Sequence, residues 1–196
     1  MLVPRIGVVG IGGFGWTHVE NLAILHEQGR LRLTAAADPV YERYRQSVDR
    51  LSGLGVKFFR SLEDLLDAGI TDGVTCATPI PLHASMALSC AAHVMPFYLE
   101  KPPAVTIQDM DRICEAVDRG GLPATIGFQY LSMPSARAVK NLIVTNRLGA
   151  VREVIAWGIW KRLESYYERT SWAGQLLEDG RYVLDGTILN PLSHAL

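Results

Sequence analysis

The run Gly10-Ile-Gly12-Gly13-Phe14-Gly15 near the start of the chain has the spacing of a loop that holds phosphates. The first glycine of such a loop permits a tight turn, and the second lets the backbone approach a pyrophosphate. The last glycine allows the next helix to pack closely on the preceding strand. The N-terminus of that helix offers amide donors and a positive dipole to the phosphates. We therefore predict that this loop, with Gly13 and Phe14 part of it, binds the pyrophosphate of a dinucleotide.

Asp38 ends a second predicted strand, 23 residues after Gly15. A carboxylate at this place can accept hydrogen bonds from both hydroxyls of an adenosine ribose. It would also repel a 2′-phosphate, so NAD is favoured over NADP, although Arg43 and Arg45 lie nearby in sequence and keep NADP open. The alternative is a strand–turn–helix unit without a ligand, in which Asp38 only caps the chain.

Two further clusters follow the fourth and fifth predicted strands, Thr78-Pro79-Ile-Pro81-Leu-His83 and Leu99-Glu100-Lys101-Pro102-Pro103. Open α/β sheets bind ligands outside the carboxyl ends of their strands, so both clusters belong on the same side as the glycine loop. Two prolines make the backbone after Lys101 rigid, and its ammonium group can point at a substrate oxygen. The alternative is an ordinary surface lysine.

The elements that must position these residues alternate between short apolar runs and amphipathic stretches. This pattern predicts βαβ units in an α/β fold with a doubly wound parallel sheet. Strands are predicted at Ile6–Val9, Leu31–Ala37, Val56–Phe59, Gly73–Ala77, Pro96–Leu99, Ala124–Tyr130 and Val151–Trp160. Helices are predicted at 16–28, 40–52, from a capping box at Ser61–Asp64, and at His83–Ala92, Ile107–Arg119 and Pro134–Asn146.

The composition is that of an ordinary globular protein, with 48% hydrophobic and 20% charged residues among 196. A net charge of −1 gives no basic surface for nucleic acid or anionic lipid. No apolar stretch approaches the ~20 residues that span a bilayer, and the glycine-rich run after Arg5 does not fit a signal peptide. Cys76, Cys90 and Cys114 lack the spacing of a disulfide frame or a zinc site and are predicted to be buried thiols. We expect a cytoplasmic protein with no metal, nucleic acid or membrane partner.

Together, the motifs GIGGFG, ADP, TPIPLH and EKPP resemble the glucose–fructose oxidoreductase / inositol dehydrogenase / MocA family of NAD(P)-dependent oxidoreductases. The resemblance implies a Rossmann domain followed by an α/β (α+β) domain that supports substrate binding and oligomerisation. It places Glu100 beside the nicotinamide ribose and Lys101 on the reacting oxygen, often with a cis Lys101–Pro102 bond. It also implies that Thr78, Pro79 and His83 flank the cofactor.

The family's second catalytic element is an Asp-x-x-x-His motif on a helix, which corresponds here to Asn190-Pro-Leu-Ser-His194. The four-residue spacing keeps both side chains on one helix face. By this resemblance His194 is the general base and Asn190 orients a substrate hydroxyl, with Asp185 as the nearest compensating carboxylate. Trp172 is a candidate substrate contact. An aromatic wall for a sugar could form from Trp157, Trp160, Tyr166, Tyr167 and Trp172, although such residues also pack in cores.

The length of this chain, 196 residues, is informative in light of the resemblance, because members of that family are considerably longer. We expect a Rossmann domain at residues 1–123, and at 124–196 the incomplete beginning of the substrate domain. The predicted function is hydride transfer between nicotinamide and a sugar, polyol or related hydroxy compound by a homo-oligomeric enzyme, with this chain a truncated form that binds NAD better than it catalyses. Two alternatives stay open: a non-catalytic NAD-binding sensor or scaffold, and an NAD-dependent glycosidase. His18 is expected to pack rather than to contact the cofactor.

Overall fold

The computed structural model describes residues 2–155, 159 and 161–185. The chain divides into two compact units, residues 1–126 and residues 127–196. The boundary falls after the sixth strand, three residues beyond the predicted end of the Rossmann domain, because that strand pairs with the sheet of the first unit.

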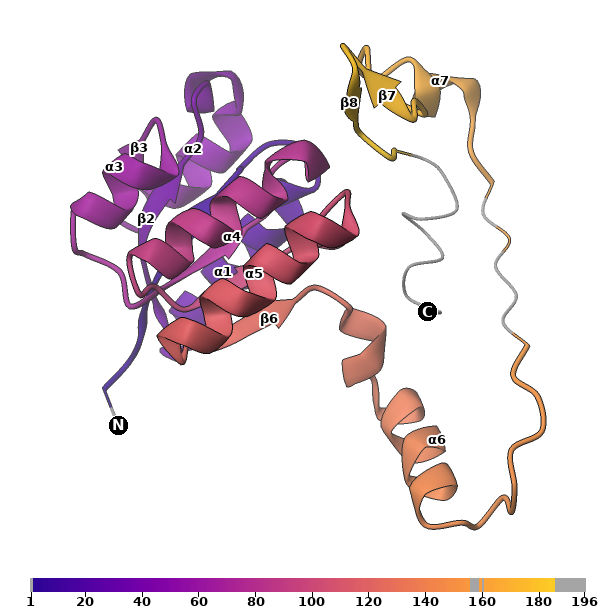
Figure 1. Cartoon of the computed structure of the whole chain (residues 1–196). Helices are drawn as coiled ribbons and strands as arrows, with labels where there is room; N and C mark the ends of the chain where they lie inside the picture. The colour runs from indigo at the N-terminus through magenta and orange to yellow at the C-terminus, as the bar shows by residue number, and fades with distance from the viewer. Residues whose placement is uncertain (1, 156–158, 160, 186–196) are drawn as a thin grey trace. The chain divides into compact units, whose positions relative to one another are not determined.

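The first unit is built on a six-stranded sheet in the order β3-β2-β1-β4-β5-β6 (Figure 1). Every neighbouring pair is parallel. This is the order of a doubly wound dinucleotide-binding fold, and it confirms the predicted class. The strands are β1 (Arg5–Val9), β2 (Arg32–Ala37), β3 (Lys57–Phe59), β4 (Gly73–Cys76), β5 (Phe97–Leu99) and β6 (Ala124–Ile126).

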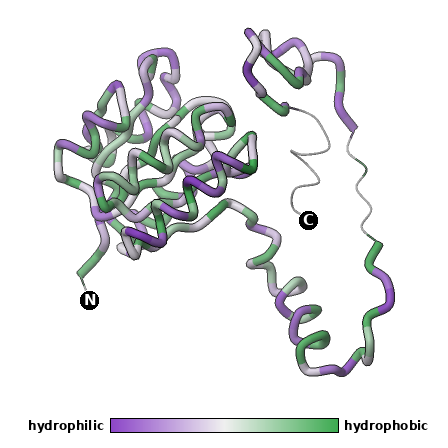
Figure 2. The backbone as a smooth tube through the Cα atoms, viewed as in Figure 1, coloured by the Kyte–Doolittle hydropathy of each residue, from purple (hydrophilic) through white to green (hydrophobic). Residues whose placement is uncertain are grey.

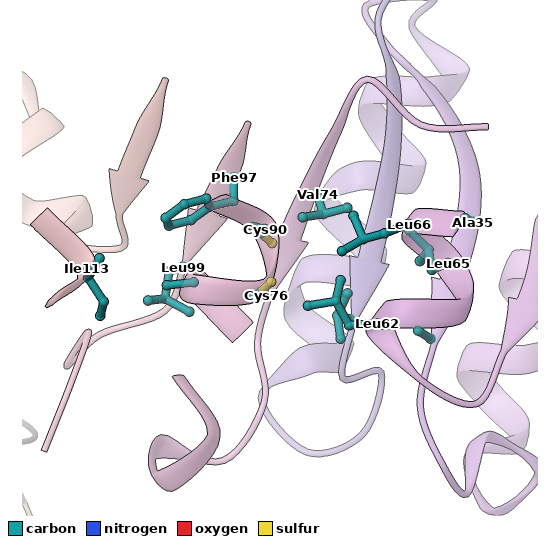
Figure 3. Packing of buried hydrophobic residues seen from close by; sticks show 13 residues of the cluster. Ala35, Leu62, Leu65, Leu66, Val74, Cys76, Cys90, Phe97, Leu99 and Ile113 are labelled. Carbon is teal, nitrogen blue, oxygen red and sulfur yellow. The ribbon is translucent and has the colours of Figure 1, made fainter. Parts of the chain in front are cut away.

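Helices cover both faces of this sheet and bury a separate apolar cluster on each. On one face pack α1 (Gly15–Glu27) and α2 (Arg45–Ser52), through side chains such as Val19 and Leu51. On the other pack α3 (Leu62–Asp67), α4 (His83–Ala92) and α5 (Ile107–Gly120), through Leu65, Cys90 and Ile113 (Figure 3). The crossovers that leave β1 and β4 therefore lie on opposite faces.

Local chemistry sets several helix ends where the sequence predicts them. The Ser61 hydroxyl accepts a hydrogen bond from the Asp64 amide at 3.0 Å, so the predicted cap of α3 is confirmed. Thr106 caps α5 in the same way through the Asp109 amide. At the other end of α5, Gly121 takes the left-handed conformation (φ 58°), as a glycine after a helix commonly does.

The three cysteines are free thiols, but they differ in exposure. Cys76 on β4 and Cys90 on α4 are buried against each other, as predicted (Figure 3). Two causes raise the pKa of Cys76: the larger is the contact with the Cys90 thiol, and the second is burial. Burial is wrong for Cys114, which lies on the exposed side of α5. No helix in the described part of the chain is long and apolar enough to cross a membrane.

The second unit contains α6 (Pro134–Val144), α7 (Glu164–Tyr167) and an antiparallel pair, β7 (Leu177–Glu178) with β8 (Arg181–Tyr182). Hydrophobic and hydrophilic residues mix along α6 (Figure 2), and none of its side chains is buried. The predicted strand at Val151–Trp160 is wrong for residues 151–155 and 159, which form no ladder. A run of apolar residues alone cannot make a strand, because the backbone also needs a partner for its hydrogen bonds.

Two connections also differ from their predictions. The strand predicted to reach Tyr130 ends at Ile126, and a short 3₁₀ helix, η3 (Gln129–Ser132), takes its place. Between β2 and α2 another 3₁₀ turn, η1 (Tyr41–Arg43), interrupts what the sequence predicts as a single helix. A third, η2 (Ile80–Leu82), precedes α4.

Replacing Ile113 by alanine should lower the free energy of unfolding by about 2–5 kcal/mol, because the change removes buried methylenes and leaves a cavity. Ile113 is 3% exposed, whereas Ile107 on the same helix is 76% exposed. Ile107→Ala is the matched control and should change stability by no more than about 0.5 kcal/mol. Urea denaturation of the two variants checks this, and equal losses would contradict the placement of Ile113 in the core.

Candidate dinucleotide site

The glycine loop follows β1 and depends on two close backbone approaches. Gly10 has a φ of 81°, and a Cβ on it would lie 2.6 Å from the carbonyl oxygen of Ala77. A Cβ on Gly15 would overlap the carbonyl oxygen of Gly10 itself. A side chain on Gly10 would therefore push the loop away from the segment after β4, and one on Gly15 would push the first turn of α1 away from the loop.

Gly12 and Gly13 have different surroundings from these two glycines. The phenol ring of Tyr44 fills the space that a Cβ on Gly12 would occupy. Gly13 has a φ of 54° and no heavy atom within 4 Å of such a Cβ, and the Phe14 side chain next to it is 60% exposed. The loop thus presents an open backbone at Gly13 and Phe14, directly before the N-terminus of α1.

Asp38 follows β2 and joins two loops. Its side chain accepts a hydrogen bond from the Ile11 amide at 3.3 Å and another from the Val40 amide at 3.0 Å. The residue is 9% exposed. Each carboxylate oxygen has two lone pairs, so both oxygens retain capacity for a further donor such as a ribose hydroxyl.

These residues fit a dinucleotide. The loop has no side chain where its backbone turns, an open stretch at Gly13, and a helix N-terminus behind it that favours negative charge. Asp38 lies at the end of the neighbouring strand, on the ribose side of such a loop. Arg43 in η1 and Arg45 at the start of α2 are both exposed.

The segment after β4 carries Thr78, Pro79 and His83. The Thr78 hydroxyl is buried and has no hydrogen-bond partner among the described residues. The His83 ring is 1% exposed, with Nδ1 at 2.6 Å from the Pro102 carbonyl oxygen and Nε2 at 2.8 Å from that of Thr78. Both ring nitrogens of His83 therefore lie against backbone carbonyl oxygens of the protein itself.

The segment after β5 is organised around the buried carboxylate of Glu100. Its Oε1 accepts hydrogen bonds from His18 Nε2 at 2.9 Å and from the Tyr98 hydroxyl at 3.2 Å. Its Oε2 accepts one from the Lys101 amide at 3.1 Å. The carboxylate thus joins the first turn of α1 to the backbone of Lys101.

Charge in this cluster follows from the same contacts. Burial raises the pKa of Glu100, but the contacts with His18, the Lys101 amide and Tyr98 outweigh burial and leave it below the usual value. Glu100 is therefore ionised at neutral pH. Burial, and then the neighbouring carboxylate, raise the pKa of Tyr98 to about 12, so its hydroxyl keeps the proton that it donates.

Lys101 is partly buried, and the bond that follows it to Pro102 is cis, as expected. The structure brings Gly10, Asp38, Thr78 and Glu100 with Lys101 to the carboxyl ends of four adjacent strands, β1, β2, β4 and β5. Ligands of open α/β sheets bind at this edge, where the strand order reverses between β1 and β4.

The predicted residues of the second unit are only partly described. Asn190, His194, Trp157 and Trp160 lie outside the described residues. Trp172 is half-buried, with the Arg169 guanidinium 5.4 Å from its ring. Asp185 is buried, and its carboxylate is paired with Arg169 and with the Gly174 amide at 2.9 Å. The charge of the Asp185 carboxylate is therefore balanced by Arg169 within this unit.

Three residues of the candidate site were missed by sequence reasoning. His18, expected to pack, bonds the Glu100 carboxylate and also lies edge-on to Phe14 with ring centroids 5.6 Å apart. Tyr98 donates to the same carboxylate, and Tyr44 rests on Gly12. Two signals were available: a histidine one turn after a glycine loop, and the two-residue spacing of Tyr98 and Glu100, which places both side chains on one side of an extended segment. The Tyr44–Gly12 contact joins segments far apart in sequence. Among the described residues, no group of three or more His, Cys, Asp or Glu side chains could hold a metal ion.

Known proteins are similar to this chain in sequence and in fold. The MocA rhizopine catabolism protein of Rhizobium meliloti is 30% identical over 145 residues, which are 74% of this chain and 44% of that protein. Inositol 2-dehydrogenase of Rubrobacter xylanophilus is 32% identical over 74% of this chain and 41% of its own length. The chain thus spans less than half the length of these curated relatives.

Among solved structures, the WlbA dehydrogenase of Bordetella pertussis, in complex with NADH and UDP-GlcNAcA, superimposes with a TM-score of 0.83 at 28% identity. That match covers 98% of this chain and 53% of WlbA. The family model for oxidoreductases with an NAD-binding Rossmann fold, Gfo/Idh/MocA, matches residues 4–128. The chain therefore belongs to the Gfo/Idh/MocA oxidoreductase family, and residues 4–128 are its NAD-binding Rossmann fold.

Proposed function

We propose that this chain binds NAD and belongs to an oxidoreductase that moves a hydride between the nicotinamide and a hydroxyl-bearing substrate. The observation that carries the proposal is the meeting of the glycine loop, Asp38 and the Glu100–Lys101 segment at one edge of the sheet. The relatives named as dehydrogenases support the reaction class. They support it only by similarity, since the chain spans part of their length.

In this proposal the glycine loop holds the pyrophosphate of NAD, and Asp38 accepts the hydroxyls of the adenosine ribose. NAD, when bound, supplies the hydride acceptor at the nicotinamide. Lys101 directs its ammonium group at the substrate oxygen and stabilises the negative charge that develops there. His194 takes the hydroxyl proton, and Asn190 orients the substrate; both assignments rest on the family resemblance.

Glu100 and His18 act on Lys101 through the backbone. The Glu100 carboxylate accepts a hydrogen bond from the Lys101 amide. His18, on α1, holds the same carboxylate through its Nε2. A rigid lysine turn matters because a misplacement of about 1 Å can cost roughly a hundredfold in rate. The Glu100 carboxylate is therefore a positioning group for Lys101, in addition to any contact with the nicotinamide ribose.

The substrate class proposed first is a sugar or polyol, after the inositol dehydrogenase relatives. A nucleotide-linked sugar is the second candidate. The observation that favours it is the match with WlbA, whose complex contains UDP-GlcNAcA and which covers 98% of this chain. By comparison, the match with the scyllo-inositol dehydrogenase of Lactobacillus casei covers 76% of this chain, with a TM-score of 0.66. Trp172 is the proposed substrate contact from this chain's second unit.

Two further parts of the proposal concern context. Exposed apolar side chains in the second unit, such as Val154 at 80%, support a homo-oligomer in which another surface covers them. The free, mutually packed thiols of Cys76 and Cys90 support a reducing compartment such as the cytoplasm. Light scattering of the purified chain tests the first of these.

The function is tested by titrating the chain with NAD and NADP, and then by following NADH formation with inositols, simple sugars and UDP-sugars. The expected result is saturable NAD binding and NADH formation with one of these classes. NAD binding without NADH formation from any of them would contradict the dehydrogenase proposal for this chain. Sugar release without net NADH would instead identify a glycosidase.

Asp38→Asn should weaken NAD binding by about ten- to a hundredfold, because charge-assisted hydrogen bonds to the ribose are lost. The preference for NAD over NADP should also shrink, since the carboxylate no longer repels a 2′-phosphate. Asp49→Asn, an exposed position on α2, is the matched control and should bind NAD like the unaltered chain. Calorimetric titration measures all three proteins. Unchanged NAD affinity in Asp38→Asn would show that the ribose is held elsewhere.

Lys101→Ala should reduce NADH formation by at least about a hundredfold while NAD affinity stays nearly constant, since the lysine stabilises charge on the substrate and not on the cofactor. Lys57→Ala on β3 is the control and should keep full turnover, because Lys57 is exposed and far from the carboxyl end of β5 in the sheet order. Steady-state kinetics with both variants gives the comparison. If Lys101→Ala instead abolishes NAD binding, the lysine has a structural role.

A further inference from the structure

His83 occupies an unusual position, since it is buried, ionisable and bonded only to backbone carbonyl groups among the contacts described above. It is the first residue of α4, and its ring reaches the Pro102 carbonyl oxygen at 2.6 Å and the Thr78 carbonyl oxygen at 2.8 Å. Pro102 directly follows Lys101, and Thr78 is the second residue after the end of β4. The ring thus lies between the two turns that form one wall of the candidate site.

The chemistry of the two acceptors limits what the ring can do. Carbonyl oxygens only accept, so a neutral imidazole donates to one of them and a doubly protonated ring donates to both. Burial lowers the pKa of His83, while the two carbonyl groups and the Glu100 charge raise it and the Lys101 charge lowers it further. We assign the proton of the neutral ring to Nδ1, which makes the shorter of the two contacts and in this tautomer donates to Pro102.

The contact between His83 and the Pro102 carbonyl joins two segments that lie beyond the end of the β4–β5 ladder. The β4–β5 ladder ends with Cys76 opposite Leu99, followed by the Glu100 amide donating to the Cys76 carbonyl at 2.9 Å. Beyond that point both chains turn away from the sheet. Because the His83 ring belongs to the β4–α4 segment, its Nδ1–H bond ties the Pro102 carbonyl to that segment two residues past Glu100.

We propose that His83 is a positioning residue for Lys101, whose buried ring clamps the Lys101–Pro102 turn to the β4–α4 segment through the Pro102 carbonyl. Lys101 is then held from two sides, by Glu100 on its own amide and by His83 on the carbonyl of the next residue. The inference deepens the proposed function and rests on it only for the role of Lys101; the clamp itself is a property of the fold. His83 then acts through the turn and not by contact with NAD.

The test uses the full chain with three substitutions. His83→Phe removes the donor and keeps a ring of similar size, while His83→Gln keeps an amide donor that can reach one carbonyl. His93→Phe is the matched control, since His93 is exposed at the other end of α4 and its Nδ1 contacts only the carbonyl of Ser89, four residues back in the same helix. NMR then follows amide hydrogen exchange at Lys101, Val9 and Val19, and the ring N–H of His83.

The expected result has three parts. The unaltered chain shows a slowly exchanging Nδ1–H on His83. In His83→Phe the Lys101 amide exchanges about tenfold faster or more, because the partly buried Pro102 carbonyl has lost its donor and the turn opens locally. Val9 in β1 and Val19 in α1 keep their exchange rates, His83→Gln lies between the two proteins, and His93→Phe changes nothing at Lys101.

Other outcomes overturn the clamp. A rapidly exchanging Nδ1–H, an unchanged Lys101 amide in His83→Phe, or equal acceleration at Val9, Val19 and Lys101 would each show that His83 does not hold this turn specifically. If His83→Phe does not fold, the Gln variant decides in the same way. The NAD titration is independent: a chain that fails to bind NAD but shows the localised exchange would contradict the proposed function and leave the clamp standing.

The kinetic consequence separates positioning from general support. In the NADH-forming assay, His83→Gln should lower kcat by about tenfold while KM for NAD stays near its original value, because the ring does not touch the cofactor. A rise in KM for NAD with unchanged kcat would overturn the inference and assign His83 to cofactor binding.

Discussion

The approach of Gly10 to the carbonyl oxygen of Ala77 is the constraint on which the candidate site depends. The Val9 carbonyl accepts the Ala77 amide at 2.8 Å, so β1 and β4 end at the same level, and a side chain on Gly10 would meet Ala77. The chain then leaves β1 toward one face of the sheet and β4 toward the other. Two segments that start together and separate in this way leave a crevice between them. The loop, Asp38 and Lys101 all lie along that edge because these two strands are neighbours.

A buried charge then joins the elements on either side of the crevice. An ionised carboxylate without partners would be costly to bury, but Glu100 has His18, Tyr98 and the Lys101 amide as donors. These donors come from α1, from β5 and from the lysine turn. A change at any one of them would leave part of the carboxylate unsatisfied, so the three segments are linked through a single side chain. This linkage explains why a glutamate, and not a neutral residue, precedes Lys101.

Much of the fold and part of the site could be predicted from the sequence, because those features follow from local backbone chemistry. Gly10 and Gly15 lie in one six-residue loop, where a side chain at either position would meet nearby backbone. The Ser61 cap of α3 accepts its hydrogen bond from the Asp64 amide, only three residues later in the chain. The alternation of apolar runs and amphipathic stretches was enough to identify the parallel sheet. The strand predicted at Val151–Trp160 failed in its described residues because a strand depends on a partner that periodicity does not reveal.

Several of the contacts that could not be predicted join segments that only the sheet order brings together. Tyr44 meets Gly12 from 32 positions away, His18 meets Glu100 from 82, and His83 meets Pro102 from 19. Residue type alone gives a histidine several possible roles, and the choice among them depends on which strand ends are adjacent. With β1, β4 and β5 consecutive in the sheet, the turns that follow them must share one edge. Polar side chains in those turns then form hydrogen bonds with the charged and carbonyl groups of the neighbouring turn. A sequence motif whose residues all resemble ligand contacts can therefore include residues that hold the turns in place.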